Sequence, residues 1–136
     1  MFACGNVLHV HDLVDYVSEE AQQAGKHAAA YVQGQREVQG REIPLKPQGA
    51  ARYTVPMSLS PQRMGEETVI RFRVGRNIRK GVVKVFGDDK LLYSRKRPVM
   101  APGEMEQVIF KREWLTGAEQ DDPRGGGRRG GAVIWQ

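Results

Sequence analysis

The fold is decided first by the stretch FACGNVLHVHDLVDYVSEEAQQAGKHAAAYV, residues 2–32. Phe2 to Cys4 are apolar or small and predict the end of a buried strand. Gly5 allows a backbone turn that a side chain would obstruct, and Asn6 can donate or accept hydrogen bonds. A turn of this kind lets a ligand approach the main chain closely.

A long helix is predicted after the loop at 7–11, from Asp12 to about Gln33. Asp12 is a candidate N-cap. Apolar residues recur beyond it at helical spacing: Leu13, Val14, Val17, Ala21, Ala24, Ala28, Tyr31 and Val32. The first backbone N–H groups of a helix lack intrahelical partners, and the macrodipole places positive charge there. The start of this helix is therefore expected to stabilise an electron-rich ligand group.

This strand, glycine turn and helix resemble the second FAD-binding motif of the pyridine nucleotide-disulfide oxidoreductase superfamily. The resemblance covers roughly the first 34 residues. The motif of that superfamily is a strand ending in Phe-Ala-(small)-Gly-Asp, a loop, and a long Ala/Gly-rich helix whose N-terminus faces the flavin ring. Gly5 matches the motif's glycine, whereas Asn6 stands where the motif has Asp, the acceptor of hydrogen bonds from the ribityl chain. Asn6 keeps one acceptor oxygen and lacks the charge.

A narrower resemblance involves three segments: CGNVLHVHDLVDYVSEE at 4–20, RYTVP at 52–56 and APGEM at 101–105. Together they are similar to the C-terminal portion of bacterial NAD(P)/FAD-dependent oxidoreductases often found beside glycerol-3-phosphate dehydrogenase-like proteins. This resemblance covers most of residues 1–115. It implies that the chain begins in the middle of a flavin domain.

The resemblance implies FAD as the cofactor and assigns six residues to its binding: Gly5, Asn6, His11, Asp12, Leu13 and Val14. Gly5 would permit the close approach, and Asn6 would bond the ribityl or phosphate region. The backbone N–H groups of Leu13 and Val14 would point at the pyrimidine edge of the isoalloxazine, where the positive helix end favours negative charge. Asp12 would cap the helix, and His11 would line the pocket without a catalytic role.

Several missing features limit the activity of the chain alone. No G-x-G-x-x-G fingerprint occurs, and the glycine run at 125–127 follows no strand and opens no helix. Cys4 is the single cysteine, so no dithiol can form within the chain. At 136 residues the chain is much shorter than a full two-nucleotide enzyme, which needs domains of about 100–200 residues each. We therefore expect no hydride transfer without the remainder of the flavoprotein or a companion subunit.

The sequence also predicts where the chain resides. One cysteine is consistent with a reducing compartment. The chain has neither a secretion signal nor an apolar run near the roughly 20 residues of a membrane span. We expect a cytoplasmic protein that has no membrane partner.

From about residue 50 the hydrophobic period changes from helical to two. Strands are predicted at 52–55, 68–74, 80–86, 91–95 and 107–111, with a short one at 42–45. The strands at 80–86 and 91–95 should form a hairpin across Gly87-Asp88-Asp89, and 98–104 should connect the last two strands. The result is an α+β chain: the last strand-turn-helix of a Rossmann-like FAD domain at 1–36, a linker at 37–49, a small immunoglobulin-like β-sandwich at 50–115 and a disordered Arg/Gly-rich tail at 116–136.

Three alternatives remain open at this stage. The helix could pack on the β-sandwich instead of covering a flavin-domain sheet. The net charge of +5 and the Gly/Arg tail also fit a small basic module that binds a protein partner or nucleic acid, although no aromatic ladder is interleaved with the basic residues. His9, His11 and Asp12 contain metal-ligating groups, but their spacing matches no established motif, and no metal is expected.

Overall fold

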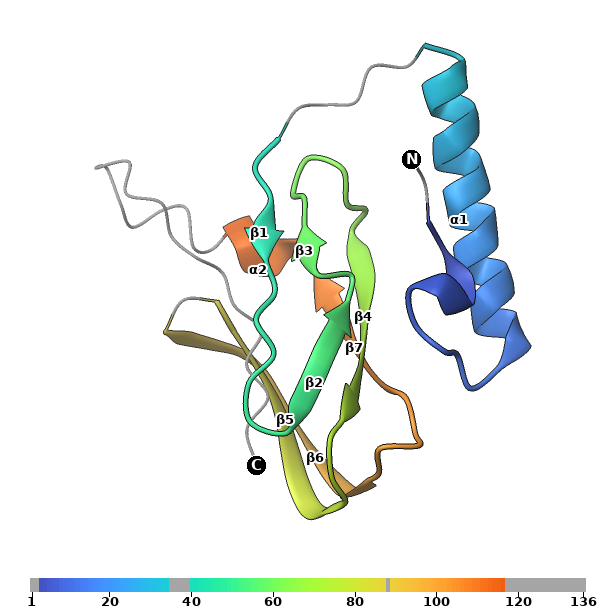
Figure 1. Ribbon diagram of the computed structural model, residues 1–136. Helices are drawn as coiled ribbons and strands as arrows, with labels where there is room; N and C mark the ends of the chain where they lie inside the picture. Colours follow the sequence, from blue (N-terminus) through green and yellow to red (C-terminus); the bar gives the residue numbers. More distant parts are fainter. Residues whose placement is uncertain (1–2, 35–39, 88, 117–136) are drawn as a thin grey trace. The chain divides into compact units, whose positions relative to one another are not determined.

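The computed structural model describes residues 3–34, 40–87 and 89–116 (Figure 1). The chain divides into an N-terminal unit, Met1–Gln39, and a β unit, Gly40–Gln136. Helix and antiparallel sheet occur together, which confirms the coarse α+β prediction. None of the helices in the described ranges is long and apolar enough to cross a bilayer.

The described residues of the N-terminal unit form a short 3₁₀ turn, η1 (Gly5–Val7), and one long helix, α1 (Val14–Val32). The helix forms because its sequence is rich in alanine and straight-chain residues, with no run of β-branched residues. It ends at Val32, and Gly34, two residues further on, has a φ of +76° that departs from the helical path at little cost for a glycine. The predicted helix, Asp12 to Gln33, thus differs from α1 by two residues at its start and one at its end.

The predicted strand at the start of the chain is not formed where the structure describes it. Phe2 lies outside the described residues, and Ala3 and Cys4 belong to no strand. Cys4 does have extended backbone angles, φ −155° and ψ 171°. A lone extended segment makes no ladder because it has no neighbouring strand to complete its hydrogen bonds.

The described residues of the β unit, 40–87 and 89–116, form seven strands and a short helix. These are β1 (Ile43–Pro44), β2 (Ala51–Val55), β3 (Ser58–Leu59), β4 (Glu67–Val74), β5 (Ile78–Gly87), β6 (Lys90–Met100), β7 (Glu106–Lys111) and α2 (Glu113–Thr116). They form three antiparallel sheets, in the orders β1-β3, β2-β4-β7 and β5-β6. Each predicted strand of this region is present, because alternating apolar and polar residues specify which face of a sheet is buried.

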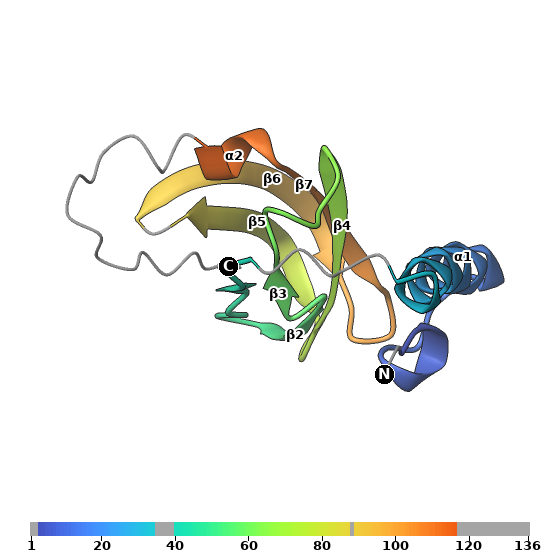
Figure 2. The same ribbon diagram turned by 90° about the horizontal axis from the view of Figure 1, so that it is seen from above.

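One hydrophobic core unites these sheets. It contains Leu45, Ala50, Leu59, Ile70, Phe72, Val74, Ile78, Val83, Val85, Met100, Val108 and Phe110. Both the three-stranded sheet and the β5–β6 hairpin contribute to it, and Figures 1 and 2 show the hairpin as a long curved ribbon beside that sheet. Leu45, which lies within the predicted linker at 37–49, and Ala50, the first residue after it, both belong to this core.

The hairpin forms as predicted, but β6 is longer than expected. It pairs with β5 from Lys90 to Met100, so only residues 101–105 connect it to β7. The strand was predicted to end at Arg95, with Pro98 at the start of the connection, whereas Pro98 lies within β6 although proline cannot donate to a ladder. An edge strand tolerates proline, since one of its sides has no ladder to complete.

Two arginines of β4 do not simply face solvent, although they alternate with its apolar core residues. Arg71 is buried, and Arg73 Nη1 donates to Gly103 O at 2.6 Å. Thr116, the first residue of the predicted disordered tail, belongs to α2. The rest of that tail, residues 117–136, and the turn residue Asp88 lie outside the described residues.

Candidate functional site

The site predicted from the sequence begins at the Gly5 turn. Gly5 is buried and has a φ of +67°, a left-handed conformation that residues with a side chain adopt at a cost. Its carbonyl oxygen accepts hydrogen bonds from the N–H groups of Leu8 and His9, at 3.0 and 3.3 Å. A Cβ added at Gly5 would lie 3.3 Å from Cγ1 of Val17, so the turn lies directly against α1. Both the backbone angle and the close helix therefore require glycine here.

Glu20 holds this turn to the helix. Its Oε2 accepts a hydrogen bond from Gly5 N–H at 3.0 Å, and His11 Nε2 lies 3.1 Å from the same oxygen. The His11 side chain is completely buried, whereas 16% of the Glu20 side chain is exposed. One carboxylate oxygen thus joins the glycine turn, the loop and the helix.

Glu20 was missed by the sequence analysis. The contact joins residues that are 15 positions apart, so no local motif contains it. A signal was nevertheless present: Glu20 lies four residues after Tyr16 and four before Ala24, within the half-buried stripe of α1. A carboxylate in such a stripe needs a partner, and Gly5 and His11 supply it.

Asn6 and His9 complete the loop. The Oδ1 of Asn6 accepts a long hydrogen bond of 3.4 Å from the N–H of His11. His9 is buried, and its ring lies edge-on to the ring of His11 with centroids 5.1 Å apart. Of the predicted site residues, the structure therefore brings Gly5, Asn6 and His11 together through Glu20.

The start of the helix differs from its prediction. The N-cap residue is Leu13, with extended backbone angles and no capping side chain, so the assignment of Asp12 as the cap was wrong. Asp12 precedes this N-cap residue by one position and therefore belongs to the loop. The carbonyl oxygen of Leu13 accepts a hydrogen bond from the N–H of Tyr16 at 3.2 Å. The side chains of Leu13 and Val14 are exposed, while their N–H groups lie at the end of the helix where intrahelical acceptors are lacking.

Charge near the helix start is negative. Residues 1–25 contain no lysine or arginine, whereas they contain Asp12, Asp15, Glu19 and Glu20. Asp15 lies in the first turn, where a carboxylate interacts favourably with the helix dipole and offsets its positive end. A ligand at this end is therefore bound better through hydrogen bonds than through a strong net positive field.

The residues of the loop do not form a metal centre. No group of three His, Cys, Asp or Glu side chains in the described ranges is placed to hold a metal ion. Cys4 is half-buried and not in a disulfide.

Comparison of the chain with protein-family models, curated proteins and solved structures gave no significant match. The function is therefore argued from the residues and their geometry.

Replacement of Gly5 by alanine should loosen the N-terminal unit. Alanine at a left-handed φ costs about 1–2 kcal/mol, and its methyl group would press on Val17. Gly25→Ala is a matched control, because Gly25 lies within α1 with no atom near its Cβ position, and there alanine favours helix by about 1 kcal/mol. Far-UV circular dichroism should show less helix in the first variant and more in the second. A gain of helix in both would contradict the strained turn.

Proposed function

We propose that this chain supplies part of the FAD-binding domain of an NAD(P)/FAD-dependent oxidoreductase, together with a β-sandwich appendage. The chain would contribute one wall of the flavin pocket and would not be catalytic alone. The remaining wall and both G-x-G-x-x-G units would come from the rest of a longer flavoprotein or from a companion subunit. FAD, when bound, would exchange hydride with NAD(P).

The observation that carries this proposal is the burial in the N-terminal unit. Among residues 3–34, Gly5 and His9 are buried as whole residues and His11 has a buried side chain, whereas no residue of α1 is buried. Apolar side chains of the loop and the helix start are instead between 48% and 78% exposed: Val7, Leu8, Val10, Leu13 and Val14. A single helix gains most of its stability from packing an apolar face, so this unit requires a covering surface. The sheet of a flavin domain would provide such a surface.

The path of the backbone supports the same proposal. Extended backbone at Cys4, the left-handed Gly5, a loop and a helix of 19 residues follow one another in the order that the FAD motif requires. The side chain that Gly5 lacks would point at Val17 of α1, so the glycine lets the turn and the helix approach each other closely. These features fit a site that a flavin approaches at the main chain.

The roles of the predicted site residues follow from this geometry. The Gly5 N–H is already bonded to Glu20, so Gly5 would contribute the tight turn against α1 rather than a hydrogen-bond donor. Asn6 is exposed and would bond the ribityl or phosphate region through its amide. The N–H groups of Leu13 and Val14 would face the pyrimidine edge of the ring. His11 would act inside the loop, where it lies against Glu20, and Asp12 would precede the helix at the pocket edge.

The β unit would be the appendage. A three-stranded sheet and a two-stranded hairpin share one apolar core, which is the arrangement expected of a small β-sandwich. No chemistry is proposed for it in the oxidoreductase reaction.

A substitution at Asn6 tests the site in the complete flavoprotein. Asn6→Leu removes the amide and should weaken FAD retention by about 2–10-fold, because one hydrogen bond contributes about 0.5–1.5 kcal/mol. Asn6→Asp keeps an acceptor oxygen and should retain FAD at least as well as the unchanged protein. Flavin fluorescence during dialysis measures both. Equal retention by all three proteins would remove Asn6 from the site.

The DNA upstream of the Met1 codon tests the proposal as a whole. The proposal expects an open frame encoding strand-G-x-G-x-x-G-helix units, with Met1 as an internal residue. An in-frame stop directly upstream would overturn the single-chain form of the proposal. A companion gene encoding those units would then be required.

A further inference from the structure

The charge of the chain is concentrated in the β5–β6 hairpin. Residues 78–100 contain seven lysines and arginines but only two aspartates, an excess of five that equals the net charge of the whole chain. The remaining residues contain 14 basic and 14 acidic side chains. The hairpin is therefore the basic region of an otherwise neutral polypeptide.

Most of these basic side chains have no ion-pair partner among the described residues. Arg97 pairs with Glu106 of β7. The other six make no hydrogen bond or ion pair within the described part of the chain, and all but the half-buried Lys84 are exposed: Arg79, Lys80, Lys84, Lys90, Arg95 and Lys96. Such a concentration of like charge is repulsive within the hairpin and favours a partner of opposite charge.

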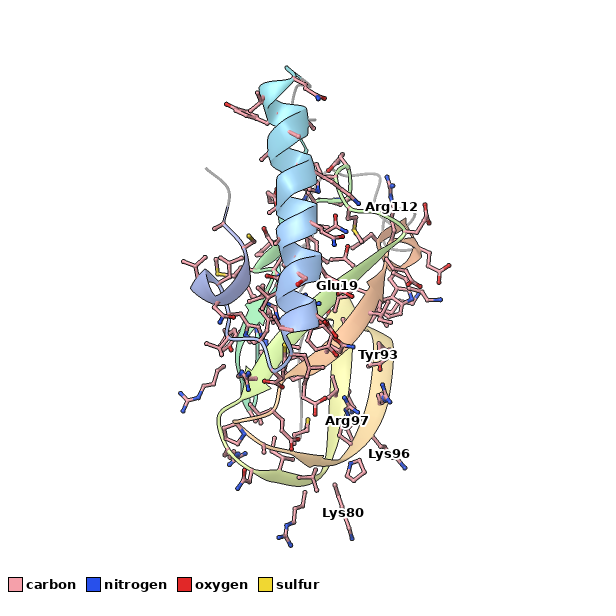
Figure 3. The ribbon with its side chains drawn as sticks, turned by 90° about the vertical axis from the view of Figure 1, so that its right-hand side faces the viewer. Glu19, Lys80, Tyr93, Lys96, Arg97 and Arg112 are labelled. Carbon is pink, nitrogen blue, oxygen red and sulfur yellow. The ribbon has the colours of Figure 1, made fainter. Side chains whose placement is uncertain are left out.

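The charges gather on neighbouring positions of the two strands. Arg79 pairs with Val99, Gly81 with Arg97 and Val82 with Lys96, so Lys80 falls opposite Pro98, one position along the ladder from Arg97 and two from Lys96. Figure 3 shows Lys80, Lys96 and Arg97 along the same stretch of the hairpin. Lys80 also has a left-handed φ of +55°, and both it and Arg79 are exposed where strict alternation would bury one of them. The β5 strand thus departs from its regular path at a point that presents two adjacent cations to solvent.

One edge of β6 is available for pairing. Among the described residues β6 pairs only with β5, over 11 residues, so its other edge presents backbone N–H and C=O groups. Two apolar side chains of β6, Leu91 and Val99, are about half exposed on either side of the basic run. The edge therefore offers main-chain hydrogen bonds, cations and apolar contacts together.

This combination fits a polypeptide better than a nucleic acid. Base stacking needs exposed aromatic rings, whereas Tyr93 of β6 is half-buried against Trp114 with ring centroids 6.0 Å apart. Exposed leucine and valine contribute little to binding a phosphate backbone but contribute directly to a protein interface. An extended peptide that adds to a sheet edge uses all three kinds of group.

We propose that the outer edge of β6 binds an acidic polypeptide segment as an added strand along Lys90–Arg97. Glutamate and aspartate side chains of the segment pair with Arg95, Lys96 and Lys80, and its backbone pairs with β6 up to Pro98, where the missing N–H ends the ladder. Lysine on an edge strand also prevents edge-to-edge aggregation. That protective role requires no binding partner, so a binding experiment distinguishes edge protection from peptide binding.

The test uses the full chain and three probes at low ionic strength. The first is a labelled peptide of about eight residues that repeats Glu-Glu-Val-Val, which places carboxylates on both faces of an extended strand and matches the length of Lys90–Arg97. The second alternates Glu and Pro and cannot complete a ladder, and the third is a short DNA duplex. Fluorescence anisotropy measures binding, and hydrogen exchange locates it. We expect the Glu/Val peptide to bind more tightly than the other two probes and to protect amides of β6.

Charge-reversal variants assign the site. Arg95→Glu with Lys96→Glu should weaken peptide binding by about tenfold or more, since two favourable ion pairs are replaced by repulsions. Lys26→Glu with Lys46→Glu changes the net charge by the same amount at exposed positions outside the hairpin, and should change affinity less than about twofold. If the double reversal fails to fold, Arg95→Gln with Lys96→Gln replaces it as the test. This variant should weaken peptide binding by an intermediate amount.

Four outcomes would overturn the proposal. Preferential binding of the duplex would assign the hairpin to nucleic acid. Absence of binding by the Glu/Val peptide would leave edge protection as the role of the charges. Equal binding of the Glu/Pro peptide would exclude strand addition, and equal losses in the hairpin and control variants would exclude the location.

Discussion

Replacement of Phe72 by alanine should lower the free energy of unfolding of the β unit by about 3–5 kcal/mol. Phe72 lies in the middle of β4, is 1% exposed and belongs to the core that both the three-stranded sheet and the hairpin share. Truncation removes buried apolar surface and leaves a cavity between elements that are held by their own hydrogen bonds. The site cannot collapse fully, so most of the cavity cost remains.

Urea unfolding followed by tryptophan fluorescence measures this change. Trp114 packs edge-on against Phe110 of the same core, with ring centroids 5.1 Å apart, so its emission reports on the core. Ile109→Ala is the control on the adjacent strand, because Ile109 is 48% exposed and faces away from the core. Its cost should be below about 1 kcal/mol. Comparable losses for the two variants would contradict a core centred on β4.

The second large effect is expected at the ion pair between the two sheets. Arg97 Nη2 of β6 lies 2.5 Å from Glu106 Oε2 of β7, and the two side chains are 27% and 7% exposed. Glu106 is paired across the ladder with Phe72 and therefore faces the core. Arg97→Met would leave a buried carboxylate without its cation and should cost about 2–4 kcal/mol, below the upper range for fully buried pairs because Arg97 is partly exposed.

A double variant separates the ion pair from packing. Arg97→Met with Glu106→Leu removes both charges and should recover most of the lost stability, because an apolar pair of similar size is often as stable as a buried ion pair. Arg95→Met, two residues away and exposed, should change stability by no more than about 0.5 kcal/mol. A loss at Arg97 no larger than at Arg95, or a double variant less stable than the single one, would show that Glu106 does not depend on Arg97.

Much of the β unit follows from the sequence because its strands alternate cleanly. Ile70, Phe72 and Val74 occupy alternate positions of the predicted strand at 68–74, and all three are buried. Period-two alternation specifies such a face directly. The last residues of β6 could not be predicted in the same way. Pro98 favours the end of a strand unless the strand lies at the edge of a sheet, and residue types alone do not show that β6 is an edge strand.

The candidate site was predicted less completely. A turn at Gly5 was predicted from that glycine alone, and Gly5 has a left-handed φ in the structure. Glu20 was missed because its contacts with Gly5 and His11 join distant parts of the unit. The cap was placed one residue early because capping depends on the angles of the preceding loop, and those angles cannot be read from residue types alone.

We propose that this chain forms one wall of a flavin site that further polypeptide completes. The most direct test is to isolate the native polypeptide from its source with an antibody against residues 40–116, and to measure its mass and its bound flavin. We expect stoichiometric FAD, in a chain longer than 136 residues or in a complex with a second polypeptide that carries G-x-G-x-x-G units. A flavin-free chain of 136 residues with no partner would contradict it.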